Sequence, residues 1–312
     1  MLRYYLKLGL LSIKANWALS GLMVAAIAIG IGACMTIVTV RHVMSDNPIP
    51  QKSDQLYHVQ VDSWSPDEPY DEPNEAPEQL TYMDAVALHS ASAAYRQVLS
   101  FKTGRVVQPD GDGERPFRVD TRATTSDFFA RFDVPFAYGS AWDHAADSAE
   151  ERVVVLSSSL NEQLYGGDDP VGRMLMVNGE TYRITGVLEY WNPIPKFYDL
   201  NNNPYEDSEQ LYLPFSLAVT GEFGSSGNTN CWKPIGDGGY QAFLASECVW
   251  IQMWVELRDA NEKQAYMQFL DAYAEEQKTV GRFARPLNNR LNNVVEWMDD
   301  REVVEDLSLI HI

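Results

Sequence analysis

The chain of 312 residues carries 24 Lys and Arg against 44 Asp and Glu, which gives a net charge of −20 at pH 7. Four of the bases and none of the acids fall within the first 41 residues, so the rest of the chain is still more acidic. Such a surface repels nucleic acid and anionic headgroups, which excludes a nucleic-acid-binding protein. The length beyond residue 41 suffices for one large domain or two small ones.

An apolar run without a charged side chain extends from Trp17 to Val40. As a helix it would reach about 36 Å, enough to cross a hydrocarbon core of about 30 Å. A cleaved signal peptide is the alternative, but its apolar region is shorter and ends in a small-residue cleavage site, which residues 41–44 do not offer. We therefore predict a transmembrane helix over residues 17–43. Its Gly and Ala residues favour packing in a helix bundle over a lone anchor.

The charges beside this run set its expected orientation. Arg3, Lys7 and Lys14 precede it, and the first acid in the chain is Asp46. Because basic residues mark the cytoplasmic side, we expect residues 1–16 in the cytoplasm and everything after about Arg41 on the exported side of the membrane. Residues 1–16 fit either a short amphipathic helix on the lipid surface or an extension of the spanning helix.

The elements after the helix begin with an alternating pattern that predicts a strand over 54–62. The acidic, proline-rich segment 65–78 lacks the Gly-punctuated Asp spacing of a calcium loop, so a solvated loop is expected instead. Thr81, with an acid three residues later, predicts the start of a helix. Two strands, 97–107 and 116–124, flank a turn that predicts a hairpin.

The middle of the chain contains shorter elements. A helical turn is expected at 126–129, a loop at 134–143 and a continuous apolar strand at 152–156. Ser157 or Ser158 can cap the next helix, which explains the serines at 157–159 better than a nucleophile cluster does. The remaining expectations are strands at 173–177 and 180–187 around Asn178-Gly179, an irregular segment at 190–209, a strand at 210–213 and a Gly-rich loop at 220–240.

The last third contains the clearest strand, 248–257, with one apolar face and with Trp250 and Trp254 on the other face. Asp259 can cap a helix that runs to about Lys278. An extended piece at 282–285 and a last helix from about Pro286 are expected to follow. Strand–helix–strand groups near both ends of an α+β domain suggest one subdomain interrupted by an insertion.

Cys231 and Cys248 lie in the predicted exported part, where disulfides persist. We predict that they pair, which encloses 16 residues. On the chain-entropy model such a bridge stabilises the fold by about 3 kcal/mol. A zinc site is disfavoured because no third Cys or nearby His completes it. Cys34, inside the apolar run, is expected to pack as a small hydrophobe.

No motif for catalysis is present in the sequence. It lacks the phosphate-binding G-x-x-x-x-G-K-[ST], the zinc-binding H-E-x-x-H and the G-x-S-x-G nucleophile elbow, and its five histidines show no metal spacing. We therefore expect a non-catalytic protein without cofactor, catalytic residue or metal ligand.

Three stretches, 127–143, 152–188 and 210–218, resemble the MacB-like periplasmic core domain of permease subunits in the MacB/FtsX class of ABC transporters. The matching features, in order, are Phe128, Phe129, Val153–Ser157, Leu164-Tyr165-Gly166, Asp169-Pro170-Val171-Gly172, Asn178-Gly179 and Gly186-Val187. The resemblance covers about residues 1–300. It implies a mixed-sheet periplasmic domain in two parts: a porter-like subdomain of residues 44–125 and 248–300, and a sabre-like insertion of residues 126–247. It also implies three later transmembrane helices, so residues 301–312 are expected to be a truncated tail.

The resemblance further implies a permease that couples ATP hydrolysis by a cytoplasmic ABC ATPase subunit to movement of the periplasmic domain, for export or efflux. A second permease copy, membrane lipid and a periplasmic adaptor protein are the implied partners. The alternative is a signal-anchored periplasmic binding or sensor domain that acts without an ATPase. That alternative depends on aromatic residues that line a ligand cleft rather than pack the long loops: Trp191, Phe197, Tyr198, Tyr205 and Trp232.

Overall fold

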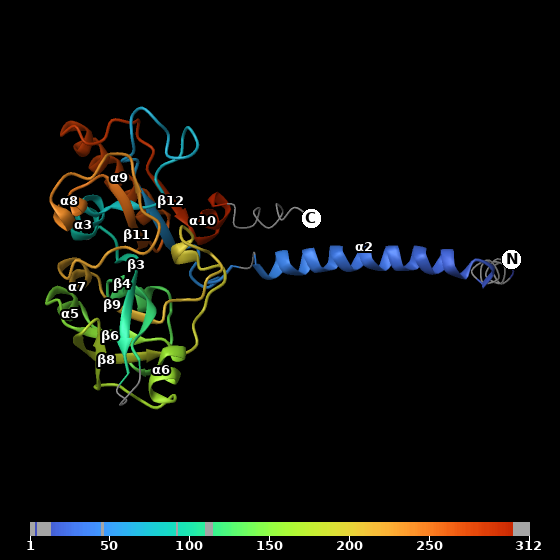
Figure 1. Ribbon diagram of the computed structural model, residues 1–312. Coiled ribbons are helices and arrows are strands. Elements are labelled where there is room, and N and C mark those ends of the chain that lie inside the picture. The colour runs from blue at the N-terminus through green and yellow to red at the C-terminus, as the bar shows by residue number, and fades with distance from the viewer. Residues whose placement is uncertain (1–3, 5–13, 45–46, 92, 110–114, 302–312) are drawn as a thin grey trace. The chain divides into compact units, whose positions relative to one another are not determined.

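The computed structural model describes residues 4, 14–44, 47–91, 93–109 and 115–301 (Figure 1). The chain divides into a helical unit, Met1–Asp46 with Val304–Ile312, and a sheet unit, Asn47–Val303. The predictions for residues 1–13, for the hairpin turn at 110–114 and for the tail at 302–312 fall almost entirely outside the described residues.

The helical unit contains α2 (Trp17–Met44), a helix of 28 residues. Its segment Trp17–Thr39 has a mean hydropathy of 2.3 and is long and apolar enough to cross a membrane. Large side chains along it, such as Leu22 and Ile29, are more than 60% exposed. The predicted apolar helix is therefore confirmed, and its side chains are available to lipid or to other helices.

The sheet unit is built on one mixed sheet, in the order β12-β1-β11-β3-β4-β9-β6-β8-β5 (Figure 1). The first half of this order joins strands from both ends of the unit by antiparallel pairing. These strands are β1 (Leu56–Gln60), β3 (Arg96–Gln108), β4 (Phe117–Thr124), β11 (Cys248–Glu256) and β12 (Arg290–Asn293). Strands from the two ends of the sheet unit are thus neighbours in this half of the sheet.

The second half of the sheet comes from the middle of the chain. It consists of β5 (Phe136–Gly139), β6 (Val153–Leu156), β8 (Glu180–Leu188) and β9 (Leu211–Pro214). Parallel pairing of β9 with β4 joins the two halves. Beside the main order, β7 (Met174–Val177) pairs with β3 and β8, while β2 (Leu80–Thr81) and β10 (Asn230–Cys231) pair with β11.

Several helices of the sheet unit begin at a polar side chain that caps them. Thr81, Ser157 and Asp259 each accept a hydrogen bond from a backbone amide of the first turn of the helix that follows, as the sequence predicts. The helices of the sheet unit are α3 (Tyr82–Ser90), α4 (Asp127–Arg131), α5 (His144–Ser148), α6 (Ser158–Tyr165), α7 (Phe215–Thr220), α8 (Gly239–Leu244), α9 (Ala260–Thr279) and α10 (Val294–Asp300), with a 3₁₀ turn η1 (Phe197–Asp199).

The core of the sheet unit consists of two clusters of buried apolar side chains, and β11 contributes to both. Met253 and Val255 lie in one cluster and Trp254 lies in the other. Trp250, expected on the same face as Trp254, instead joins Met253 and packs 4.8 Å from Phe101 between ring centroids. The pairing register of β11 shifts between Val249 and Ile251, which explains the change of face.

Several predicted elements are wrong. The segment 134–143, expected to be a loop, contains β5, which pairs with β8 at the edge of the sheet. The last helix begins at Val294 rather than near Pro286, and the extended piece is β12 at 290–293 rather than 282–285. Pairing with β1 fixes β12 in its position, and no local pattern marks this contact in the sequence.

Candidate functional site at the start of the sheet unit

Residues 47–55, here called the junction segment, connect α2 to β1. Only residues 45 and 46 separate the end of α2 at Met44 from Asn47. The segment folds into consecutive turns, in which the amides of Lys52 and Ser53 donate to the carbonyl of Ile49 at 3.1 and 2.9 Å. Ile49 itself is 3% exposed and packs in the core cluster that contains Trp254 and Trp297. The junction segment is therefore a packed part of the sheet unit.

Lys52 ties the junction segment to the end of α4. Its ammonium group donates to the carbonyl oxygens of Ala130 at 3.0 Å and Arg131 at 3.3 Å and pairs with the Asp133 carboxylate. Gln51 donates to the same carboxylate at 3.3 Å. Charge-assisted bonds of this kind are stronger than neutral ones. The junction segment is thus bonded directly to residues 130–133, without the sheet as an intermediary.

Two further backbone contacts tie the junction segment to α10 and to the end of β11. The carbonyl of Ser53 accepts from the amide of Val294, the first residue of α10, and the carbonyl of Gln55 accepts from the amide of Leu257. Tyr57 of β1 lies opposite Asn293 of β12 in an antiparallel pair. The start of β1 therefore lies beside the end of β12, so the chain enters the sheet close to the point where its last helix begins.

His58, on β1, lies between the aromatic rings of Trp254 and Trp297. Its imidazole stacks on Trp297 at 4.0 Å and meets Trp254 edge-on at 5.2 Å, between ring centroids. It is 1% exposed, and neither ring nitrogen has a hydrogen-bond partner. Burial, helped by the charge of Arg301, lowers the pKa of His58 to about 3. The ring is neutral at physiological pH and serves the packing between β1 and α10.

A buried ion cluster lies where the two halves of the sheet meet. The guanidinium of Arg122 on β4 bridges the carboxylates of Asp199 and Glu209, and Lys196 lies 3.3 Å from Glu209. All four side chains are fully buried. Burial alone would raise the pKa of Glu209, but the charges of Arg122 and Lys196 hold it well below its usual value.

The same cluster reaches β11, because Gln252 donates to Asp199 at 2.7 Å. The irregular segment 190–209 is therefore held to β4 and β11 by polar bonds, although its own sequence shows no periodic pattern. Removing one member of such a cluster leaves an unpaired buried charge, which is costly.

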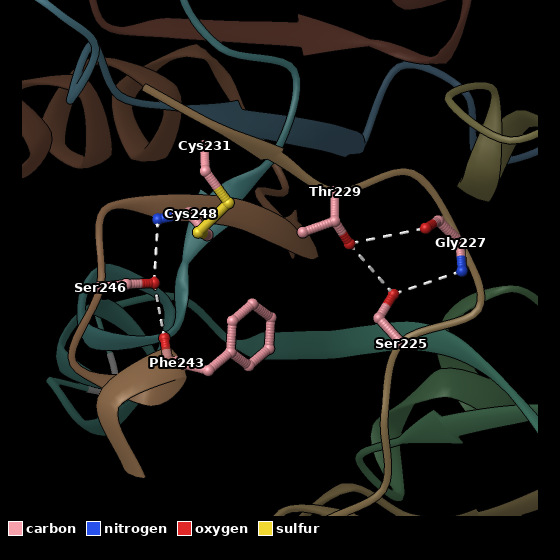
Figure 2. Close-up of a disulfide and its surroundings, with 7 residues drawn as sticks. All are labelled: Ser225, Gly227, Thr229, Cys231, Phe243, Ser246 and Cys248. Carbon is pink, nitrogen blue, oxygen red and sulfur yellow. Dashed lines mark hydrogen bonds between the residues drawn. A yellow bond between two sulfur atoms is a disulfide. The ribbon is translucent and has the colours of Figure 1, made fainter. Parts of the chain in front are cut away.

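The predicted disulfide between Cys231 and Cys248 is present (Figure 2). The two cysteines lie opposite each other in the antiparallel pair of β10 and β11. Figure 2 also shows the hydroxyl of Ser246, which accepts from the amide of Cys248 and donates to the carbonyl of Phe243. The bridge thus fastens the Gly-rich segment 221–239 to the central strand β11.

The aromatic residues expected to line a ligand cleft do not gather in one cleft. Phe197 and Tyr198 are 1% exposed and belong to the core. Trp191 stacks on Tyr198 at 5.2 Å, and Trp232 lies elsewhere, under the ammonium of Lys233. Packing of the long loops accounts for most of them. Ser157 caps α6, and no group of three His, Cys, Asp or Glu residues in the described ranges could hold a metal.

The family model of the MacB-like periplasmic core domain matches residues 20–273 of this chain. Among curated proteins, the macrolide export ATP-binding/permease protein MacB of Rhodospirillum rubrum is 27% identical over 191 residues. The match covers 59% of this chain and 28% of that relative, so the chain spans less than a third of the length of the curated relative that it matches.

Two solved structures are also similar to this chain. The periplasmic region of MacB from Actinobacillus actinomycetemcomitans gives a TM-score of 0.50 at 14% identity, over 81% of this chain and 95% of that structure. The extracellular domain of the noncanonic ABC-type transporter YknZ from Gram-positive bacteria gives 0.45 at 14% identity, over 76% and 100%. The first likeness shows a shared fold.

Proposed function

Because the chain belongs to the MacB-like periplasmic core domain family, we propose that it is a permease subunit of an ABC transporter of the MacB/FtsX class. A separate cytoplasmic ATPase subunit hydrolyses ATP, and α2 passes the resulting movement across the inner membrane to the sheet unit, for export or efflux. In this proposal residues 1–16 lie in the cytoplasm and the sheet unit lies in the periplasm.

The observation that best supports the proposal is the way in which the junction segment is held. Two residues separate α2 from a segment that is bonded to the end of α4, to α10 and to the end of β11. A flexible linker would absorb a displacement of the helix. A short, packed junction instead passes it to elements that lie far apart in the sequence, as a switch between packed states requires.

The pairing of β1 with β12 gives a second line of support. A domain whose first and last strands are neighbours can be held by the membrane at both chain ends. This arrangement suits a permease that continues into further transmembrane helices, as the family resemblance implies. Movement of either end would then act on the same pair of strands.

We also propose that the sheet unit works as two parts, a porter-like subdomain of residues 44–125 and 248–300 and a sabre-like subdomain of residues 126–247. On the main strand order the strands of each part are contiguous and the parts meet at the β4–β9 pair, while β7 and β10 of the second part also pair with β3 and β11 of the first. The buried cluster around Arg122 bridges this boundary. A second permease copy and a periplasmic adaptor protein complete the proposed assembly.

The test is to purify the protein from its native membrane, expressed from the complete reading frame, together with the ABC ATPase encoded in the same genome. We expect the two to copurify and the complex to hydrolyse ATP. Alkaline phosphatase fused after Met44 should be active, because it folds only outside the cytoplasm. Failure to associate with any ABC ATPase, or an inactive fusion that a cytoplasmic reporter shows to be expressed, would contradict the proposal.

A further inference from the structure

A groove of about 860 Å³ runs beside β3, β6 and β8. Its lining brings together Arg105, Arg152 and Arg183, an unusual concentration of bases on so acidic a protein. Two of the three are neutralised within the groove: Arg152 pairs with Glu180 at 3.0 Å, and Arg183 pairs with Glu151 at 3.2 Å. Arg105, the third arginine, is not paired in this way.

Arg105 is a buried cation without an acidic partner. Its side chain is 9% exposed, and its guanidinium lies over the ring of Phe223 at 3.5 Å from the ring centroid. One nitrogen donates to the hydroxyl of Thr103 at 3.0 Å, while Nε has no partner. Among the residues that the structure describes, no carboxylate lies within ion-pair distance of it. Burial lowers the pKa of Arg105, yet an arginine keeps its charge at neutral pH.

An unpaired buried charge is expensive, and proteins retain one where something else supplies the counter-charge. A guanidinium presents its donors in a planar fork that matches carboxylate and phosphate oxygens. The rest of the groove contains apolar side chains, among them Val153, Leu217 and Phe223. Glu150 also lines it, but this side chain is exposed, so water and salt screen its charge.

We propose that this groove binds an anionic group, a carboxylate or a phosphate monoester, carried on an apolar body, and that Arg105 is its charge partner. The apolar body packs against the aliphatic and aromatic lining, and the anion takes the free donors of the guanidinium. The inference depends on the groove alone and holds whether or not the chain acts with an ATPase.

Calorimetric titration of the full chain in nanodiscs of zwitterionic lipid tests the proposal with four probes: hexanoate, hexyl phosphate, inorganic phosphate and hexanol. We expect hexanoate or hexyl phosphate to bind and hexanol not to bind. Phosphate that binds as tightly as hexyl phosphate would overturn the role of the apolar body. Hexanol that binds as tightly as hexanoate, or no anion binding at all, would overturn the proposal.

The variant Arg105→Gln should weaken binding of the acidic probes by about tenfold or more, because a charged hydrogen bond is lost. Arg173→Gln is the matched control: it also removes one arginine stacked on a ring, that of Tyr165, but it does not line the groove. Equal weakening by both variants would contradict the assignment. In the ligand-free protein, Arg105→Met should raise the melting temperature, whereas a purely structural role for the guanidinium would lower it.

Discussion

The ammonium of Lys52 lies 3.0 Å from the carbonyl oxygen of Ala130, and this bond joins the segment that follows α2 to α4. The two residues are 78 positions apart in the sequence. Lys52 is also within bonding distance of Arg131 and Asp133, so one side chain collects three acceptors at the end of α4.

Replacing Lys52 by Met should therefore loosen the junction without disturbing the core. We expect a loss of about 1–3 kcal/mol in the free energy of unfolding, which is typical of hydrogen bonds to a charged group. If the proposed coupling is correct, export falls while ATP hydrolysis continues. Lys278→Met, which removes only an exposed pair with Glu275, is the matched control. Export at the wild-type level in both variants would speak against transmission through Lys52.

The disulfide gives a second prediction. Cys231→Ser and Cys248→Ser should each lower the melting temperature of the chain in detergent, and the loss in unfolding free energy should be about 2–4 kcal/mol. Cys34→Ser leaves the bridge intact and serves as the control. Identical melting of the wild-type protein with and without reductant would show that the bridge contributes nothing to stability.

Disrupting the buried ion cluster should lower the free energy of unfolding more than removing the disulfide does. Arg122→Met leaves Asp199 and Glu209 side by side in the interior without their shared cation. Breaking a buried pair in this way costs about 3–5 kcal/mol. Arg152→Met breaks an exposed pair with Glu180 and should cost less than about 1 kcal/mol. Chemical denaturation of the two variants provides the measurement, and similar losses would contradict the importance of the cluster.

The lowered pKa of His58 predicts that the stability of the folded protein decreases at acidic pH. Its pKa is about 3 in the folded protein and 6.5 when unfolded, so between these values the unfolded chain binds a proton that the folded chain does not. Stability should therefore fall as the pH drops from 6.5 toward 3, by about 1.4 kcal/mol for each pH unit from this group.

The variant His58→Phe, which keeps an aromatic ring between Trp254 and Trp297, should show a shallower loss over this range. Above pH 6.5 the stability curves of the two proteins should run parallel. Equal slopes below pH 6 would show that the imidazole is already protonated in the folded protein.

Local chemistry made much of the fold predictable. Helix caps at Thr81, Ser157 and Asp259 satisfy backbone amides within three residues, so the sequence alone contains both partners. The Asn178-Gly179 turn between β7 and β8 is equally local, and both residues have positive φ. The capping box of Asn293 and Glu296 was also visible in the sequence and could have placed the start of α10 correctly.

Features that depend on distant partners were not predictable. The short strand β5 gains its conformation from β8, about fifty residues later. The segment 190–209 has no pattern of its own, because Arg122 and Gln252 hold it from other strands. Nothing in the sequence around Arg105 indicates that its guanidinium lacks an acid, since pairing is decided by the elements that pack around it.

The antiparallel contact of Tyr57 with Asn293 has a consequence for the evolution and engineering of this body. Since its first and last strands are adjacent, the sheet unit together with its junction segment and α10 forms a cassette that could be grafted into an exposed loop of a host protein with little distortion of either. The same adjacency would allow a short peptide to close the ends into a ring, with new termini opened at the hairpin beyond β3.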